Sequence, residues 1–135
     1  MNHVLVIAEQ RDGQLRSATF NAITCGKQLA AATGGQLVAL LLGSGLGAAA
    51  TELARYGVAK VAVVDRPELA RYLAETHAPV VKAAAEKLGA SHILATATAF
   101  GKDLLPRVAA LLEAGMVSEI VTVVGPKTFK RPVVA

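Results

Sequence analysis

The stretch of the chain whose residues could most readily do chemistry is GSGLGA, from Gly43 to Ala48. It lies between an apolar run and a helix-forming run, and the next apolar run ends at Asp65. A G-x-G-x-x-A loop between a strand and a helix, with an acid about 20 residues further on, is the pattern with which dinucleotide-binding domains hold a pyrophosphate and a ribose. Gly43, Gly45, Ala48 and Asp65 are therefore candidate residues for binding NAD or FAD.

The position of this loop argues against that function. The dinucleotide fingerprint usually lies in the first strand–helix unit, whereas here it follows the second apolar run. Small residues after a strand also have a steric role, because they let the following helix lie close to the sheet. We therefore favour a structural turn, with Asp65 as a turn or capping residue.

A second loop, TATAFGKDLLPR, separates a predicted strand from a predicted helix. Backbone N–H groups at a helix N-terminus, with small hydroxyls and a glycine nearby, could hold an anion. Thr96, Thr98 and Gly101 are the candidate residues of such an anion loop. The simpler interpretation is that the two threonines cap the helix and that Gly101 permits close packing.

The remaining reactive side chains predict neither catalysis nor metal binding. His3, His77 and His92 each lack a second His, Cys or Glu at the spacing of a metal site. Cys25 is the single cysteine, which excludes an internal disulfide, and it falls on the apolar side of a predicted helix. We expect a buried thiol there, no catalytic residue and no metal site.

Neither the acidic residues nor a search for known motifs adds a candidate catalytic or phosphate-binding residue. The chain contains no G-x-S-x-G elbow and no G-x-x-x-x-G-K-[ST] phosphate loop. Glu9 with Asp12, and Asp65 with Glu68, flank predicted turns. We expect these acids to be solvated caps rather than acid–base pairs.

Strands and helices alternate along the chain. Uninterrupted apolar runs predict strands buried on both faces at residues 3–9, 36–42, 60–65, 91–95 and 119–124, with a last extended segment at 128–134. Helical periodicity predicts helices at 18–32 and 46–56, a short helical piece at 67–75, and helices around 80–88 and 100–111. Gly34, Gly57 and Gly89 should end three of the helices, and Pro79 should lie in a first turn. The alternation predicts an α/β domain, a parallel sheet with helices on both faces.

Composition limits the function classes further. The chain has 135 residues, a length typical of one domain, and 53% hydrophobic residues, enough for a sizeable core. Its 14 Lys and Arg are interspersed with 10 Asp and Glu, without a basic tract, so we expect no nucleic-acid partner. No apolar run approaches the roughly 18–20 residues of a membrane helix, so we expect no membrane insertion.

Several stretches of the chain, taken in order, resemble the N-terminal domain of the electron transfer flavoprotein alpha subunit. The resemblance covers the chain through HVLVIAE, SATFNAIT, ELARYGVAKVAVVD, RYLAETHAPVV, SHILATATAFGKDLLPRVAALL and VSEIVTVVGPKTFKRPVVA. It implies a three-layer parallel-sheet domain of the nucleotide-binding, adenine nucleotide alpha hydrolase-like type. The GSGLG glycines are not required by the family and look like local variation.

The resemblance also implies a function. In the family, a heterodimer of alpha and beta subunits carries electrons on FAD from acyl-CoA or other dehydrogenases to a quinone oxidoreductase. Most FAD contacts come from a C-terminal domain, so no FAD-binding residue can be assigned to this chain. We expect a scaffold and partner-interface domain without catalysis, in the cytoplasm of a bacterium or the mitochondrial matrix of a eukaryote.

Two alternative functions and two expectations about the chain itself remain. The alternatives are a stand-alone adenine-nucleotide-binding protein and a dinucleotide-binding domain that uses the GSGLGA loop. Because the chain closes on the strand-like run TFKRPVVA, we expect residues 1–135 to be a domain of a longer chain. We also expect the isolated chain to self-associate through residues 128–135, since an unpaired strand edge favours association.

Overall fold

The computed structural model describes residues 3–96, 98–112, 122–125 and 128–130. Its elements in chain order are β1 (His3–Ile7), β2 (Gln10–Arg11), β3 (Gln14–Leu15), α1 (Ala18–Thr33), β4 (Leu37–Gly43), α2 (Gly47–Leu53), the short 3-10 helix η1 (Ala54–Tyr56), β5 (Lys60–Asp65), the 3-10 helix η2 (Pro67–Leu69), α3 (Ala74–Leu88), β6 (Ala90–Leu94), α4 (Ala99–Leu112), β7 (Thr122–Gly125) and β8 (Thr128–Lys130). Up to α4, this order confirms the predicted alternation of strands and helices.

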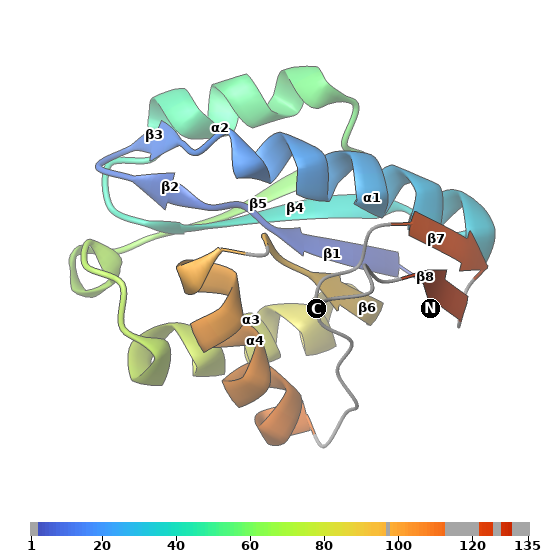
Figure 1. Cartoon of the computed structure of the whole chain (residues 1–135). Coiled ribbons are helices and arrows are strands. Elements are labelled where there is room, and N and C mark those ends of the chain that lie inside the picture. Colours follow the sequence, from blue (N-terminus) through green and yellow to red (C-terminus); the bar gives the residue numbers. More distant parts are fainter. Residues whose placement is uncertain (1–2, 97, 113–121, 126–127, 131–135) are drawn as a thin grey trace.

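Four of the strands form a parallel sheet in the order β5-β4-β1-β6. β1 lies inside the sheet, where Val4 pairs with Leu37 of β4 on one side and with His92 of β6 on the other. Helices α1 and α2 cover one face of the sheet, and α3 and α4 cover the other, as Figure 1 shows. The fold is thus the three-layer α/β fold that the sequence predicts.

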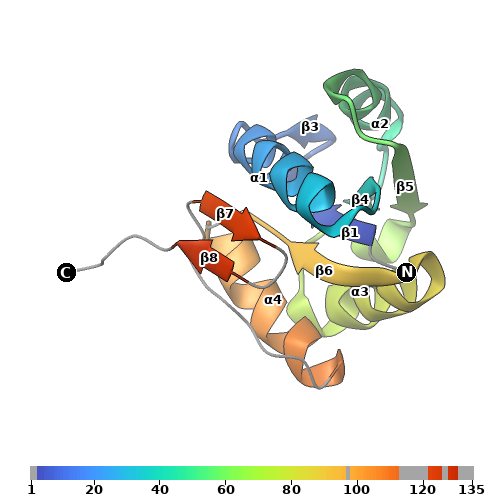
Figure 2. The same ribbon diagram turned by 90° about the vertical axis from the view of Figure 1, so that its right-hand side faces the viewer.

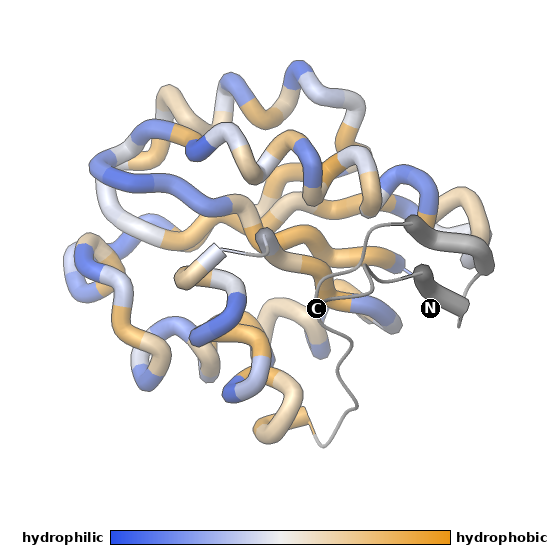
Figure 3. Tube along the Cα trace, in the orientation of Figure 1, coloured by the Kyte–Doolittle hydropathy of each residue, from blue (hydrophilic) through white to orange (hydrophobic). Residues whose placement is uncertain are grey.

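The core consists of two apolar layers, one on each face of the sheet. Successive side chains of β1 point to opposite faces, so Val4 and Val6 join the layer under α1 and α2, while Leu5 and Ile7 join the layer under α3 and α4. All four of these side chains are fully buried. Figure 3 shows the central strands as the most hydrophobic part of the trace, which explains why their sequences do not alternate with polar residues.

The helices end at the glycines that were predicted to end them, but one proline lies at a different position in its helix than predicted. Gly34, Gly57 and Gly89 adopt left-handed conformations after α1, η1 and α3, as predicted. Pro79 was predicted in a first turn, and this prediction is wrong because α3 begins at Ala74 and holds Pro79 in its interior. The earlier start buries three more residues of the helix (Ala74, His77 and Ala78), which offsets the backbone hydrogen bond that Pro79 removes.

The C-terminal strands also differ from the expected alternation. β7 and β8 pair with each other in an antiparallel register, with Val123 opposite Phe129, and form a two-stranded sheet of their own. Figure 2 shows this hairpin set apart from the four-stranded sheet. The chain between β7 and β8 is too short for the crossover that parallel pairing needs, so a hairpin is the local solution. Residues 119–121 and 131–134 of the two predicted strands lie outside the described residues.

Close packing of α1 on the sheet generates a first prediction. A Cβ atom at Gly26 would lie 2.7 Å from both Leu37 Cδ1 and Val6 Cγ2, whereas a Cβ at Gly47, the first residue of α2, would meet nothing within 4 Å. We expect Gly26→Ala to lower the free energy of unfolding by about 1 kcal/mol, because overpacking outweighs the gain in helix propensity. The control Gly47→Ala should leave it unchanged or slightly raised. Urea unfolding measures both, and equal stability of the two variants would contradict the close packing.

Candidate functional site

The order in which strands join the sheet reverses at β1, and this reversal places a candidate site at the carboxyl ends of the strands. From β1 the chain first adds β4 and β5 on one side of the sheet, and then returns to add β6 on the other side. In open parallel sheets, ligands bind beside such a reversal, beyond the carboxyl ends of the strands. Glu9 follows β1 at this point, and the loop of Thr96 and Thr98 follows β6.

The structure brings Glu9 and the two predicted threonines together. Thr96 Oγ1 donates to Glu9 Oε1 at 2.8 Å, and Thr98 Oγ1 donates to the same oxygen at 2.6 Å. The two hydroxyl oxygens lie 2.7 Å apart, and Thr96 is only 4% exposed. The hydroxyls that could have received an external anion therefore already hold a carboxylate of the chain itself. The prediction that Glu9 is a solvated cap is therefore wrong.

The backbone of Glu9 is held as firmly as its side chain. Its N–H donates to Thr19 Oγ1 at 2.9 Å, and the Thr19 hydroxyl in turn donates to the Glu9 carbonyl at 3.0 Å. Thr19 belongs to the first turn of α1 and is fully buried. The local sequence pattern does not indicate this contact between Thr19 and Glu9, because in the pattern Thr19 is one of several small residues of an amphipathic helix.

Gly101, the third residue of the predicted anion loop, has a packing role. A Cβ at Gly101 would collide with the Thr96 carbonyl oxygen, so the first turn of α4 can lie this close to the loop only with glycine there. This agrees with the packing interpretation of Gly101. The anion loop itself stays a prediction that only a ligand experiment can test.

The GSGLGA loop also binds a carboxylate of the chain. The N–H groups of Gly45 and Leu46 donate to the two carboxylate oxygens of Asp65, each at 3.0 Å. Gly45 needs its left-handed backbone, with φ of 71°, to present its N–H in this way. Asp65 thus occupies the position that a dinucleotide phosphate would need, and it acts as a capping residue. Ala48 is exposed, and its neighbour Ala49 packs into the core instead.

The hairpin of β2 and β3 covers the same loop. Gln10 Nε2 donates to the Leu42 carbonyl at 3.0 Å, and a Cβ at Gly43 would collide with this amide. A Cβ at Gly13, in the hairpin turn, would lie 3.1 Å from the Gly45 carbonyl oxygen. The sequence predicts only a turn here, whereas the structure has a hairpin packed over the glycines. Gly43, Gly45 and Asp65 are therefore near one another, but in an arrangement that favours a structural role.

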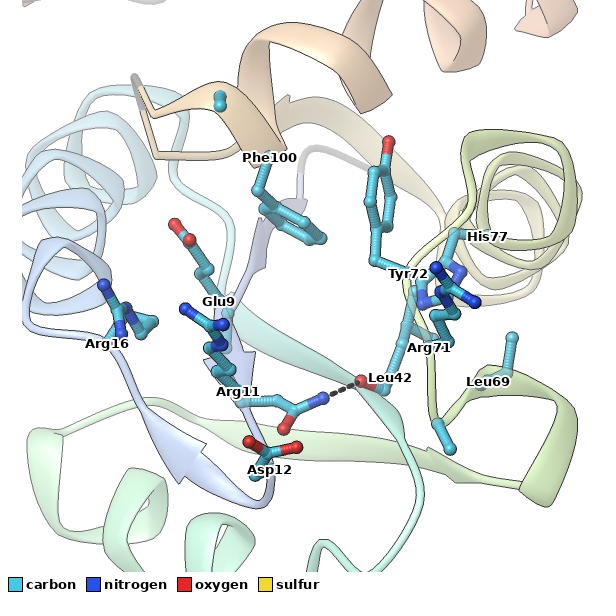
Figure 4. A pocket seen from close by; sticks show the side chains of 14 residues that line it. Glu9, Arg11, Asp12, Arg16, Leu42, Leu69, Arg71, Tyr72, His77 and Phe100 are labelled. Atoms are coloured by element: carbon cyan, nitrogen blue, oxygen red, sulfur yellow. Dashed lines mark hydrogen bonds between the residues drawn. The ribbon is translucent and has the colours of Figure 1, made fainter.

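A cavity of about 550 Å³ lies next to Glu9 at this edge of the sheet. Figure 4 shows Arg11 and Arg16 on one side of it, Arg71 on the other, and the Phe100 ring pointing in between. The guanidinium groups of these arginines have no hydrogen bond or ion pair to another described residue. The sequence analysis missed all four residues, since isolated arginines and a lone aromatic carry no spacing signal.

The rings of Tyr72, His77 and Phe100 line one wall of the cavity. The Tyr72 ring lies 5.0 Å from the rings of both His77 and Phe100, in edge contacts, and the Tyr72 hydroxyl donates to Asp103 Oδ2 at 2.6 Å. Desolvation and the Asp103 carboxylate raise the pKa of Tyr72, so the phenol stays protonated. Burial lowers the pKa of His77, which is 2% exposed, against the opposing effect of its hydrogen bond to the Leu73 carbonyl.

The other reactive side chains lie away from this edge. Cys25 packs half-buried against the core, where desolvation raises its thiol pKa. Ser91 Oγ lies 2.8 Å from His92 Nδ1, but both residues belong to the amino-terminal half of β6, and Ser91 is exposed. Within the described ranges, no group of three or more His, Cys, Asp or Glu is placed to hold a metal ion. Of the helices described, none has the length and apolar character needed to cross a membrane.

The Asp65 contacts generate a second prediction. Asp65→Ala removes the acceptor of two N–H groups at the start of α2, so we expect the free energy of unfolding to fall by about 1 kcal/mol, the usual effect of losing a helix cap. Hydrogen exchange at the Gly45 and Leu46 amides should become faster. Glu68→Ala, an exposed acid without these contacts, is the control. Saturable NAD binding by the wild-type chain, detected by calorimetry, would overturn the structural role of the loop.

The buried His77 generates a third prediction. Its pKa in the folded chain lies below the ordinary value of 6.5, so the unfolded chain binds more protons as the pH falls through that range. The stability that comes from neutral His77 should be complete above pH 6.5 and decrease as the pH drops below it. His77→Gln should lose stability at every pH through altered packing, but its midpoint of urea unfolding should fall less between pH 7.5 and 5. Equal slopes for both proteins would contradict this.

Residues 4–135 match the family described as the electron transfer flavoprotein domain. The chain is 44% identical to the electron transfer flavoprotein subunit alpha of Pseudomonas aeruginosa, over 98% of this chain and 41% of that protein, and 35% identical to the Bacillus subtilis subunit alpha, over 96% and 40%. It is 39% identical to the lactate dehydrogenase (NAD(+),ferredoxin) subunit LctC of Acetobacterium woodii, over 86% and 28%.

The fraction of each relative's length that the chain matches is as informative as the sequence identity. The chain spans about two fifths of the length of the subunits alpha of Pseudomonas aeruginosa and Bacillus subtilis. The described residues form one parallel sheet with its covering helices and two small hairpins, which is the amount of structure that one domain needs. The chain belongs to the electron transfer flavoprotein family, as the N-terminal domain of its alpha subunits.

Proposed function

We propose that this domain is a scaffold and partner interface in the alpha subunit of a heterodimeric flavoprotein that carries electrons from dehydrogenases to the respiratory chain. The observation that carries the proposal is the match of residues 4–135 to the family, with two subunits alpha aligned over nearly the whole chain. The site geometry supports it, because both candidate ligand-binding loops already hold carboxylates of the chain, Asp65 in one and Glu9 in the other.

The cofactor and the partners follow from the same proposal. FAD is bound in the complete heterodimer, by a part of the alpha subunit beyond these 135 residues, so that residues 1–135 are a domain of a longer chain. The partners are the beta subunit, acyl-CoA or other dehydrogenases, and a quinone oxidoreductase. The domain itself catalyses no reaction. One relative bears the name of a lactate dehydrogenase subunit, which supports association with dehydrogenases.

The location follows from the relatives. The similar proteins include subunits of bacteria and a subunit named mitochondrial from Dictyostelium discoideum. We therefore propose the cytoplasm if the source is a bacterium and the mitochondrial matrix if it is a eukaryote. Self-association of the isolated domain through residues 128–135 stays a prediction, because part of that segment lies outside the described residues.

Flavin content provides the fourth prediction. The purified 135-residue chain should be colourless, without the flavin absorption bands at roughly 375 and 450 nm, because the isoalloxazine ring carries that absorption wherever it is bound. The same chain within a complete alpha subunit, co-purified with beta, should carry FAD. Stoichiometric FAD on the isolated chain would show that this domain holds the cofactor itself. A complete heterodimer without flavin would overturn the proposed function.

A further inference from the structure

Three arginines surround the cavity beside Glu9 and have no role in holding the fold together. Arg11, in β2, and Arg16, just before α1, lie on one side of the cavity, and Arg71, just after η2, lies on the other (Figure 4). All three are exposed, and their guanidinium groups make no hydrogen bond or ion pair with another described residue. Their donors are therefore available to a group from outside the domain.

The two acids that line the cavity leave these arginines unpaired. The Glu9 carboxylate accepts the Thr96 and Thr98 hydroxyls, and Asp12 lies exposed in the turn between β2 and β3. The lining thus has three arginines and two acids, an excess of positive charge. Carboxylates are the natural complement of such a surface, because the planar guanidinium fork matches the two oxygens of a carboxylate.

An apolar surface lies between the arginines and continues beside the cavity. The rings of Tyr72 and Phe100 meet in an edge contact at 5.0 Å, and the Phe100 ring points into the space between the arginines (Figure 4). Leu73 directly follows Tyr72 in the chain and is 46% exposed, which is unusual for a large hydrophobic residue of the described part of the chain. An apolar side chain from outside would bury these groups.

The exposure of the arginines favours a protein segment over a small anion. Small-molecule sites bury most of their ligand, and a lone ion pair at an exposed side chain contributes little because water screens it. Protein interfaces instead combine arginines with aromatic residues, and the surrounding contacts exclude water from the pairs. The cavity has this combination in Arg71, Tyr72 and Phe100, and its volume of about 550 Å³ has room for an inserted side chain.

We propose that this cavity docks an acidic segment of a partner protein that also carries an aromatic side chain. The carboxylates of the segment pair with Arg71 on one side and with Arg11 and Arg16 on the other, and the aromatic side chain packs against Phe100. This inference deepens the proposed function, on which it rests for the role of the domain as a partner interface. It adds which surface meets a partner and what chemistry that partner carries.

The test is a titration of the 135-residue chain at low ionic strength, followed by calorimetry and by amide chemical shifts. The probe is the random copolymer of glutamate and tyrosine, and it should bind saturably with the largest shifts at Arg71 and Phe100. Polyglutamate, which lacks the ring, should bind at least about tenfold more weakly, as the loss of a buried aromatic anchor does. The copolymer of lysine and tyrosine should not bind. Added salt should weaken binding, since exposed charges are screened.

Matched variants decide which residues are responsible. Arg71→Gln should weaken binding of the glutamate–tyrosine copolymer about tenfold, as loss of a charge-assisted contact does, and Arg11→Gln provides a second variant if the first fails to fold. Arg55→Gln is the control and should bind like the wild-type chain, because Arg55 is exposed on η1 and does not line the cavity. Phe100→Leu should weaken binding of the glutamate–tyrosine copolymer but leave polyglutamate unchanged.

Four results would overturn the proposal. The first is no saturable binding of the glutamate–tyrosine copolymer at ~1 mM, where even a contact of about −4 kcal/mol would show. The second is equal binding of the lysine–tyrosine copolymer, and the third is binding that Arg71→Gln and Arg11→Gln both leave unchanged. The fourth is citrate binding as tightly as the copolymer, which would make the cavity a site for small anions.

The outcome is separable from that of the proposed electron-carrier function. The titration needs no flavin, whereas the electron-carrier function is tested by the FAD content of the complete heterodimer. Failure of the titration with FAD present in the heterodimer would remove only the docking surface. A flavin-free heterodimer, together with copolymer binding that Arg71→Gln weakens, would remove the electron-carrier function and keep the acidic docking surface.

Discussion

The carboxyl edge of the sheet depends on the hydrogen bonds of Glu9. A half-buried carboxylate is unfavourable unless donors replace the water that it loses. The hydroxyls of Thr96 and Thr98 do this at 2.8 and 2.6 Å, distances typical of strong bonds to a charged acceptor. Its backbone is fixed to α1 through Thr19. One residue thus joins β1, α1 and the loop after β6, and it sets the position of α4 relative to the sheet.

Asp65 has a similar role at the end of β5, the edge strand next to β4. The N–H groups at the start of α2 need acceptors, and the carboxylate at the end of β5 supplies both. In each loop an acid of the chain accepts these hydrogen bonds, so the donors are paired without a ligand. This pairing supports the proposed role of the domain as a scaffold, because the Gly45 and Leu46 N–H groups and the Thr96 and Thr98 hydroxyls already donate to the chain itself.

The fold could be predicted from sequence further than the site could. Buried strands such as Leu37–Gly43 and glycine stops such as Gly34 are local patterns, and the structure confirms them. The Glu9–Thr98 contact spans 89 positions, so no local pattern could reveal it. The start of α3 before Pro79 depends on burial of His77 and Ala78, a tertiary effect that outweighs the local preference of proline.

The GSGLGA pattern shows why a motif of correct spacing can arise without its usual ligand. In a βαβ unit, paired positions of neighbouring parallel strands are separated by one helix and its loops, and here Gly43 pairs with Asp65. An acid about 20 residues after a glycine loop is therefore a consequence of sheet register, whatever the loop binds. What distinguishes a dinucleotide loop is that its N–H groups remain available to phosphate. In this chain the Gly45 and Leu46 N–H groups donate to Asp65 itself, so the same acid that completes the motif in the sequence closes the loop in the structure.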